Sequence, residues 1–329
     1  MNKRRELIIA CALLAPLAAF AQPKDRKLWR VGFLSSESNA RFMNADRVGA
    51  FRAGLRDLGY EEGKNLVVEF RWADGNDDRL PELAEELVQL KVDVIVTHAI
   101  RPLRAAMNAT TMIPIVTATS GDVVAQGLVS NLARPGGNMT GEIFFSTELA
   151  AKRIELLKDA LPQLTQAAVL LDANGTETQS SLIVQAMEAT ARPRNLRLHM
   201  FRVSRPLEFE AAFAAMVRQS LGAVAITDYP LFISNPMLLA DLAVKHKLAS
   251  IGPITVALAG GLMAYGVDFR AMWYRAAAFV DKIFKGTKPG DIPIEQATRF
   301  EMIVNMRTAK ALGMSIPQSI LLRATNVIE

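Results

Sequence analysis

Apolar positions along the first half of the chain follow two alternating periods. Four segments read as strands because they are short apolar runs or alternate with period two: residues 30–34, 66–72, 92–97 and 113–117. Helical spacing lies between them. Val48, Phe51 and Leu55 share one face of a helix predicted over residues 44–58, and Pro81 is placed to open a second helix. The first half therefore alternates strand and helix.

The second half repeats this alternation. Its predicted strands are residues 167–171, 196–203, 223–227 and 250–251, and its predicted helices are residues 182–191, 208–218 and 236–247. Strands that alternate with helices favour parallel sheets with right-handed crossovers. Residues 222–227 (GAVAIT) also echo residues 92–97 (VDVIVT), each run ending on Thr before a polar loop. The pattern predicts an α/β protein with two doubly wound parallel-sheet lobes.

The first 21 residues differ from the rest of the chain. Residues 2–5 are basic or polar, residues 7–19 form an apolar run, and residues 19–21 read Ala-Phe-Ala. The run is shorter than the roughly 20 residues that span a bilayer, so the pattern predicts a secretory signal peptide cleaved after Ala21. An uncleaved membrane anchor is the alternative. Arg4-Arg5 loosely fits twin-arginine export, which leaves the choice between that route and the general secretory route open. The segment before Cys11 resembles a lipoprotein box but leaves almost no apolar region ahead of the cysteine.

Composition changes once this segment is set aside. The 329 residues suggest about two domains, and the net charge of +5 falls to +3 without the three basic and one acidic residues of 1–21. That charge is too diffuse to indicate nucleic-acid binding. Cys11 is the only cysteine, so the mature chain can form neither a disulfide framework nor a cysteine zinc site, and a cysteine-free chain suits the bacterial periplasm. We expect a soluble periplasmic monomer.

Motifs for catalysis and cofactors are absent from the sequence. There is no phosphate-binding loop, dinucleotide fingerprint or nucleophile elbow, and the glycine-rich residues 134–141 lack the lysine that a phosphate loop needs. His98, His199 and His246 lie far apart and do not form a metal motif. We therefore predict no cofactor, no metal and no enzymatic activity.

Polar loops follow the predicted strands, and ligands of open parallel sheets bind beyond the carboxyl ends of strands. The candidate ligand contacts are Ser35, Ser36, Thr97, His98, Arg101, Ser120, Asp122, Asn174, Asp228, Tyr229 and Tyr265. If two lobes face each other, these loops line one cleft.

Each of these side chains has a competing structural explanation. Asp122 and Asp228 could accept hydrogen bonds from a ligand ammonium, or Asp122 could cap a helix over residues 123–132 and Asp228 could bond its own loop amides. His98 could contact the ligand or bond to backbone. Ser35, Ser120 and Asn174 could favour a ligand carboxylate or act as helix caps. Tyr229 and Tyr265 could wall the ligand or pack in the core.

Seven segments together resemble a known family across nearly all of the mature chain. They are residues 31–35 (VGFLS), 51–60 (FRAGLRDLGY), 79–84 (RLPELA), 91–97 (KVDVIVT), 132–138 (LARPGGN), 152–158 (KRIELLK) and 308–313 (TAKALG). The chain resembles the substrate-binding proteins of ABC transporters that include tryptophan- and tyrosine-type uptake receptors. The resemblance implies a type I periplasmic-binding fold, hinge closure on a small ligand, and delivery to an ABC permease in the inner membrane.

The resemblance also implies interleaved lobes. The first would hold residues 28–139 and 266–300, with a helix over residues 272–284. The second would hold residues 140–265 and 301–329. Crossovers are expected near residues 138–141, 262–266 and 300–305. Because each lobe would consist of two separate stretches of the chain, dividing the sequence at its midpoint would not separate the lobes.

The sequence departs from the family in the ligand loops. Relatives usually carry small residues after the strand that ends at Thr97, whereas this chain reads His98-Ala99-Ile100-Arg101. Val123 stands where relatives often have Pro, and Val267-Asp268 replaces a Pro-Asn-like pair. We hypothesise that Arg101 binds a ligand carboxylate; an exposed arginine at a helix start is the alternative. The ligand is therefore predicted only as an amino acid or related small carboxylate.

Three other functions are compatible with parts of this pattern. A sensory binding protein that presents its ligand to a membrane receptor would use the same fold and signal. A transcriptional repressor core would need an N-terminal helix-turn-helix, where this chain has a predicted signal peptide instead. A secreted enzyme is disfavoured by the missing nucleophile, base and metal groups.

Overall fold

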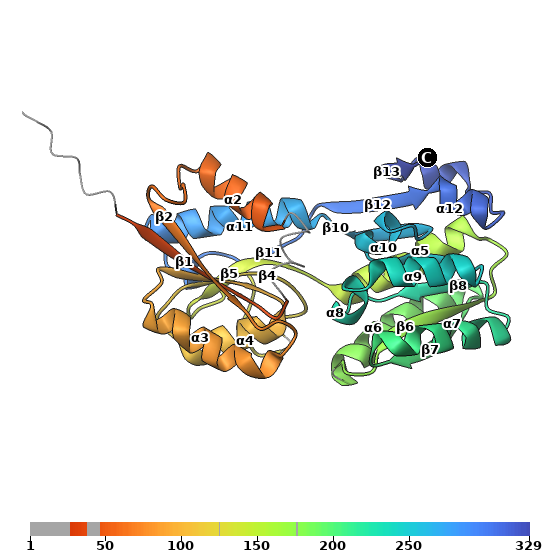
Figure 1. The fold of residues 1–329 in the computed structure, drawn as a ribbon, viewed down its shortest axis with the longest axis horizontal. Coiled ribbons are helices and arrows are strands. Elements are labelled where there is room, and N and C mark those ends of the chain that lie inside the picture. The colour runs from red at the N-terminus through yellow and green to blue at the C-terminus, as the bar shows by residue number, and fades with distance from the viewer. Residues whose placement is uncertain (1–26, 38–46, 125, 176) are drawn as a thin grey trace, which may run out of the picture.

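Two α/β lobes joined by three chain crossings form the protein (Figure 1). The computed structural model describes residues 27–37, 47–124, 126–175 and 177–329. The predicted signal peptide and its cleavage site lie outside these residues. Within them, no helix is both long enough and apolar enough to cross a membrane.

The first lobe is built on a six-stranded sheet in the order β11-β5-β4-β3-β1-β2, in which all neighbours are parallel. The strands are β1 (Trp29–Ser35), β2 (Leu66–Trp72), β3 (Val94–His98), β4 (Ile115–Ser120), β5 (Met139–Phe144) and β11 (Glu295–Gln296). The helices are α2 (Arg47–Asp57), α3 (Leu80–Gln89), α4 (Ile100–Ala109) and α11 (Phe269–Phe284). Helices α2 and α11 share one apolar cluster, and α3 and α4 share another.

A close helix contact explains why α11 belongs to the first lobe. A Cβ atom at Gly54 of α2 would lie 2.6 Å from the backbone oxygen of Tyr274 on α11, so only glycine allows this approach. Phe51 of α2 and Trp273 of α11 pack edge to face, with ring centroids 6.2 Å apart. These contacts pack α11 against α2 beside the first sheet.

The second lobe is built on a seven-stranded sheet in the order β13-β12-β10-β9-β8-β6-β7. Its strands are β6 (Gln166–Asp172), β7 (Arg197–Val203), β8 (Ala223–Ile226), β9 (Ala249–Gly252), β10 (Met263–Val267), β12 (Phe300–Asn305) and β13 (Asn326–Ile328). The pair β10 and β12 is antiparallel. The helices are α5 (Ser146–Ala160), α6 (Glu177–Ala191), α7 (Phe209–Arg218), α8 (Pro230–Ile233), α9 (Pro236–Lys245), α10 (Ile254–Leu258), α12 (Met306–Ala311) and α13 (Gln318–Leu321). Short 3₁₀ turns occur at Asp77–Arg79, Arg192–Arg194, Pro206–Glu208 and Pro289–Asp291.

The three crossings lie beside the predicted segments rather than on them. Residues 139–144 form β5 of the first sheet, so the first crossing comes at Phe145 and not at 138–141. Strand β10 runs to Val267 before the second crossing, and the third crossing ends where β12 begins at Phe300. The segments predicted as crossovers are thus largely strands, and the lobe boundaries shift accordingly.

The missed strand β5 has an unusual composition. Gly141 has a φ of +139°, and a Cβ atom there would lie 2.1 Å from the Thr117 backbone oxygen on β4. The next residue, Glu142, is buried. A glycine and an acid at the centre of a six-residue strand interrupt the apolar run by which strands are recognised.

The helix predicted over residues 123–132 is also wrong. The described residues of this segment form turns and bends. Asp122 does not cap a helix; its Oδ1 accepts a hydrogen bond from the Val124 amide at 3.0 Å. Such a local side-chain bond stabilises a turn in place of a helix start.

Apolar contacts continue from one lobe to the other at the crossings. Leu149 of α5 joins the core cluster of the first lobe together with Phe144, Val267 and Ala297. Tyr265 of β10 packs against the core clusters of both lobes. The apolar cores of the two lobes therefore meet at the crossings.

Candidate functional site at the facing strand ends

The carboxyl ends of both sheets point toward the opposite lobe. Strand β5 leads directly into the first crossing, and the strands β1–β4 run parallel to it. In the second lobe, β10 leads into the second crossing, and β6, β8 and β9 run parallel to β10. The loops after these strands therefore face each other, which is where parallel α/β sheets bind ligands.

Ser35 and Thr97 lie within the first lobe at the ends of their strands. Both side chains are fully buried. The Ser35 Oγ accepts a hydrogen bond from the Glu37 amide at 3.1 Å, and the Thr97 Oγ1 donates to the Thr117 Oγ1 at 3.2 Å. Ser36 is half-buried beside Ser35, and Ser120 is the last residue of β4. These hydrogen bonds of Ser35 and Thr97 stabilise the carboxyl ends of β1 and β3.

His98 is held in one tautomer by two neighbours. Its Nε2 lies 3.2 Å from Nη1 of Arg47, and its Nδ1 lies 3.1 Å from the Ala118 backbone oxygen. Because a guanidinium can only donate, Nε2 accepts, and Nδ1 carries the proton that is donated to Ala118. His98 therefore bonds to the backbone of β4, and its Nε2 also lies 3.6 Å from Oε1 of Glu37.

Arg47 is a buried cation that the sequence analysis missed. It begins α2, is 4% exposed, and lies over the ring of Phe269 with its Cζ 4.6 Å from the ring centroid. Burial lowers the pKa of Arg47, and the charge of Glu37, whose Oε1 lies 3.6 Å from Nη1, opposes this shift. Its signal in the sequence is an arginine directly before Val48, the first apolar position of the helix face.

Arg101 lies in the first turn of α4 with an exposed side chain. Its Nη1 donates to Oδ2 of Asp77 at 2.8 Å in the same lobe. In the second lobe, burial raises the pKa of Asp172 at the end of β6, and hydrogen bonds from Asn174, followed by the charge of Arg101, oppose this shift. The side chain of Arg101 thus bonds within its own lobe.

Asp228 is bound by a buried arginine. Arg153 of α5 donates from Nη1 to Oδ2 at 2.7 Å and from Nη2 to Oδ1 at 2.8 Å. Arg153 therefore binds both oxygens of the carboxylate. The sequence had suggested a ligand ammonium or the loop's own amides as partners of Asp228, and it had not suggested Arg153. A ligand ammonium would have to compete with a bidentate guanidinium, so we leave Asp228 out of the proposed contacts.

Tyr229 and Asn174 also bond within the second lobe. Tyr229 is 6% exposed, and its hydroxyl lies 2.9 Å from the Oγ of buried Ser180. Burial raises the pKa of Tyr229. The Asn174 Nδ2 donates to the Ser204 backbone oxygen at 2.9 Å while the residue remains exposed. Tyr229 occupies a core position, whereas Asn174 is accessible to a ligand.

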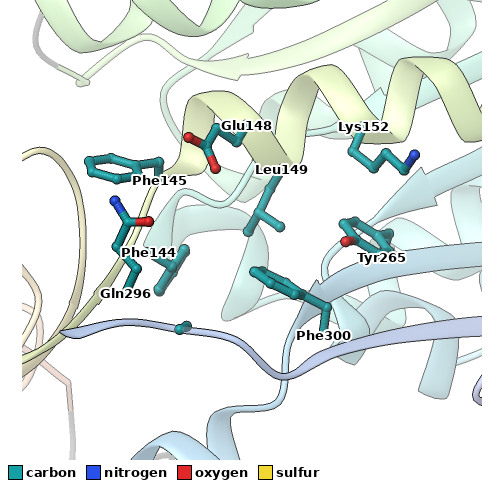
Figure 2. A pocket seen from close by; sticks show the side chains of 9 residues that line it. Phe144, Phe145, Glu148, Leu149, Lys152, Tyr265, Gln296 and Phe300 are labelled. Atoms are coloured by element: carbon teal, nitrogen blue, oxygen red, sulfur yellow. The ribbon is translucent and has the colours of Figure 1, made fainter.

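Tyr265 lies where the chain crosses between the lobes. It is one of nine residues that line a cavity of about 260 Å³, shown in Figure 2. The lining residues come from all three crossings: Phe144, Phe145, Glu148, Leu149, Lys152, Tyr265, Gln296, Ala297 and Phe300. The rings of Tyr265 and Phe300 stack with centroids 5.8 Å apart. The lining residues include no other predicted ligand contact, so Tyr265 lies apart from the other candidate residues.

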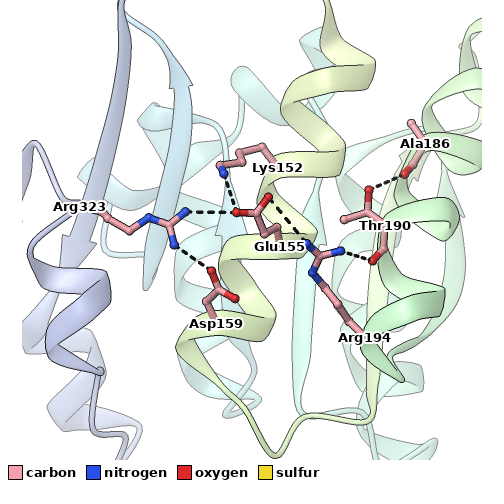
Figure 3. Close-up of polar contacts among 7 residues, drawn as sticks. All are labelled: Lys152, Glu155, Asp159, Ala186, Thr190, Arg194 and Arg323. Atoms are coloured by element: carbon pink, nitrogen blue, oxygen red, sulfur yellow. Dashed lines mark hydrogen bonds and ion pairs between the residues drawn. The ribbon is translucent and has the colours of Figure 1, made fainter.

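The outer side of α5 carries a network of ion pairs (Figure 3). Glu155 accepts from Lys152 at 2.5 Å and lies 3.4 Å from Arg323 and 4.0 Å from Arg194. The hydrogen bond from Lys152 lowers the pKa of Glu155. These side chains are partly exposed, so each pair contributes little on its own. Among the described residues there is no group of three His, Cys, Asp or Glu that could hold a metal ion.

Comparison with known proteins identifies the class. Residues 41–328 match the family described as ABC transporter substrate binding protein, and the chain belongs to this family. Proteins of this family bind a substrate outside the cytoplasm rather than transform it. Two lobes with parallel-dominated sheets confirm the predicted type I periplasmic-binding-like fold.

Individual relatives support the same class. The chain is 28% identical over 265 residues to the tyrosine-binding protein of Clostridioides difficile (strain R20291), covering 80% of this chain and 75% of the relative. A conserved domain protein of Vibrio cholerae superposes with a TM-score of 0.82 at 25% identity, covering 92% of this chain and all of that structure. An ABC domain from Streptococcus pneumonia in complex with L-Trp superposes with a TM-score of 0.81 at 22% identity, covering 91% of this chain and 99% of that structure.

Proposed function

We propose that this protein is the periplasmic receptor of an ABC importer. It captures an amino acid or related small carboxylate between its lobes, closes around the ligand at the hinge, and delivers it to a permease of the inner membrane. It acts as a monomer and reaches the periplasm through a signal peptide cleaved after Ala21. The observation that carries this proposal is the opposition of the two sets of strand ends, which brings polar loops from both lobes face to face in a protein of the substrate-binding family.

Polar groups on both sides provide the proposed ligand contacts. The first lobe offers Ser36, His98, Ser120 and Asp122, and the second lobe offers Asn174. Backbone amides beside these residues favour a carboxylate. The names of a tyrosine-binding relative and of a structural neighbour holding L-Trp make aromatic amino acids the first ligands to test.

Ligand that remains bound during purification tests this proposal directly. We expect mass spectrometry of small molecules released by denaturing freshly purified protein to detect an amino acid or small carboxylate. Added back, that compound should raise the melting temperature, because it binds only the folded state. Failure of every amino acid and carboxylate to stabilise the protein, together with turnover of any one of them, would overturn the receptor proposal.

Export is tested separately. N-terminal sequencing of protein recovered from the periplasm should begin at Gln22. A first residue in the segment before Ala21, or recovery only in the membrane fraction, would contradict the predicted cleavage.

A further inference from the structure

The cavity of about 260 Å³ at the three crossings, here called the crossing cavity, shares only Tyr265 with the candidate ligand contacts. Its floor is apolar, because Phe144, Leu149 and Ala297 are each less than a tenth exposed. Phe300, another lining residue, keeps 36% of its surface exposed. Small-molecule sites share this make-up of a concave apolar surface with a few polar groups. The crossing cavity therefore has the composition of a binding site.

Two charged side chains of α5 line the crossing cavity, and they differ in their partners. Lys152 donates to Oε1 of Glu155 at 2.5 Å, and its ammonium group lies at the Tyr265 end of the cavity (Figure 2). The carboxylate of Glu148 lies at the other end, beside Phe145. Within the part of the chain that the structure describes, the Glu148 side chain forms no ion pair and no hydrogen bond. The charge of the lining that lacks a counter-charge is therefore negative.

The aromatic rings of the crossing cavity favour a ligand of the opposite charge. Four rings line it: Phe144, Phe145, Tyr265 and Phe300. The rings of Tyr265 and Phe300 are nearly parallel, with 13° between their planes, so together they form a flat wall. The face of an aromatic ring attracts cations, and aromatic rings are a common way of binding organic ammonium groups. A carboxylate beside such rings adds a charge-assisted hydrogen bond to the same ligand.

We propose that the crossing cavity is a second binding site, for a small organic ammonium ion with one aromatic ring. The ammonium group pairs with Glu148, and the ring packs against Leu149 and Phe300. The volume lies below the range of about 300–1,000 Å³ that is usual for ligand sites, which limits the occupant to a small molecule. An anionic ligand would meet the charge of Glu148 instead. This site goes beyond the proposed receptor function and does not depend on it.

Two probes of similar size and opposite charge test the chemistry of the site. Protonated 2-phenylethylamine is the cation, and 3-phenylpropanoate is the anion. With so few contacts, we expect titration calorimetry to show roughly millimolar binding of the amine and weaker binding of the anion. If the amine does not bind the unaltered protein, or if the anion binds as tightly, the proposal is overturned.

Glu148→Gln tests where the amine binds, because it removes the charge and keeps the size of the side chain. An ion pair with an exposed partner changes an equilibrium constant by at most about five-fold, so we expect amine binding to weaken by about that factor. The control is Glu188→Gln, which removes an exposed acid from α6 of the same lobe and should leave the affinity unchanged. Equal losses in the two variants would show a general effect of charge and overturn the site.

Phe300→Leu tests the aromatic wall. It keeps an apolar side chain at a partly exposed position, so the fold should be retained, and an unchanged melting temperature would verify this. Loss of the ring should weaken binding of the amine by about two- to five-fold and leave binding of the anion unchanged. Unchanged affinity for the amine in Phe300→Leu would place the amine outside the crossing cavity.

Discussion

Arg153 and Asp228 join the start of the second lobe to its ligand-facing edge. Besides its two bonds to the Asp228 carboxylate, Arg153 donates from Nε to the Tyr265 backbone oxygen at 2.7 Å and from Nη1 to the Ile226 oxygen at 3.2 Å. One side chain of α5 thus holds the ends of β8 and β10. Helix α5 follows the first crossing, and β10 precedes the second. The bonds of Arg153 therefore hold the chain segments of these two crossings in a fixed relative position.

Removal of Arg153 should be strongly destabilising. Arg153→Met leaves the Asp228 carboxylate partly buried without its counter-charge, and loss of one partner of a buried pair costs about 3–5 kcal/mol. Urea unfolding followed by circular dichroism should show this loss. The control is Arg323→Met, which removes the partly exposed ion pairs to Asp159 and Glu155 and should cost about 1 kcal/mol. Similar losses in the two variants would contradict the structural role of Arg153.

Glu142 should make stability depend on pH. Burial, and secondly the charge of Glu295, which lies opposite it on β11, raise the pKa of Glu142 to about 7. A raised pKa means that the folded state prefers the protonated carboxyl. The contribution of Glu142 to stability is therefore full below its ordinary pKa of 4.5 and is lost as the pH rises through about 7.

The variant Glu142→Gln stays uncharged and should avoid this loss. We expect it to be about 1–2 kcal/mol more stable than the unaltered protein at pH 8, a figure reduced from the full pKa shift because neighbouring arginines and solvent screen the charge. The two proteins should converge near pH 5. Thermal unfolding from pH 5 to 8 measures the difference, with Glu148→Gln on the exposed side of α5 as control. Parallel pH profiles of Glu142→Gln and the unaltered protein would refute the prediction.

Tyr229 should affect stability rather than ligand binding. Tyr229→Phe removes the hydroxyl that bonds to the fully buried Ser180, which leaves the Ser180 hydroxyl unsatisfied at a cost of about 1–2 kcal/mol. The second change Ser180→Ala should recover part of this loss. Affinity for the released ligand should stay unchanged in Tyr229→Phe. A loss of affinity with unchanged stability would instead place the tyrosine hydroxyl against the ligand.

Gly141 should tolerate no side chain. Gly141→Ala would drive a Cβ atom into β4 at a φ that non-glycine residues rarely adopt, and we expect a loss of more than about 3 kcal/mol or a failure to fold. Gly63→Ala is the control, because Gly63 also has a positive φ of 80° but open space where the Cβ would lie; it should cost about 1 kcal/mol. Equal losses would mean that φ alone, and not the contact with Thr117, decides the cost.

The elements that the sequence predicted well are those whose apolar pattern matches their burial. Residues 223–227 were expected as a strand, and β8 (Ala223–Ile226) is buried at every position. The helix expected over residues 236–247 is α9. In contrast, residues 262–266 and 300–305 were expected as crossovers from the family resemblance, whereas they lie largely in β10 and β12, an antiparallel pair of the second sheet that stands next to the crossings.

Site residues were harder to predict because partners distant in sequence decide their roles. Asp228 was recognised as a carboxylate at a strand end, yet its role depends on Arg153, 75 positions earlier. The signal for Arg153 was present: it lies on the same helical stripe as Leu149, Leu156 and Ala160, all buried. An arginine within an apolar stripe indicates a buried counter-charge, and a carboxylate at a strand end is the natural partner.

The interleaved chain also sets the order in which the molecule can mature. During synthesis from the amino terminus, α2 emerges early, but the helix that covers it, α11, follows only after most of the second lobe. Until then, Phe51 and Leu55 of α2 lack the apolar side chains of α11 that bury them, and the first sheet lacks its edge strand β11. Such distant contacts slow folding and leave apolar surface open to aggregation. The growing chain thus cannot complete the core of its first lobe until its last quarter has been made.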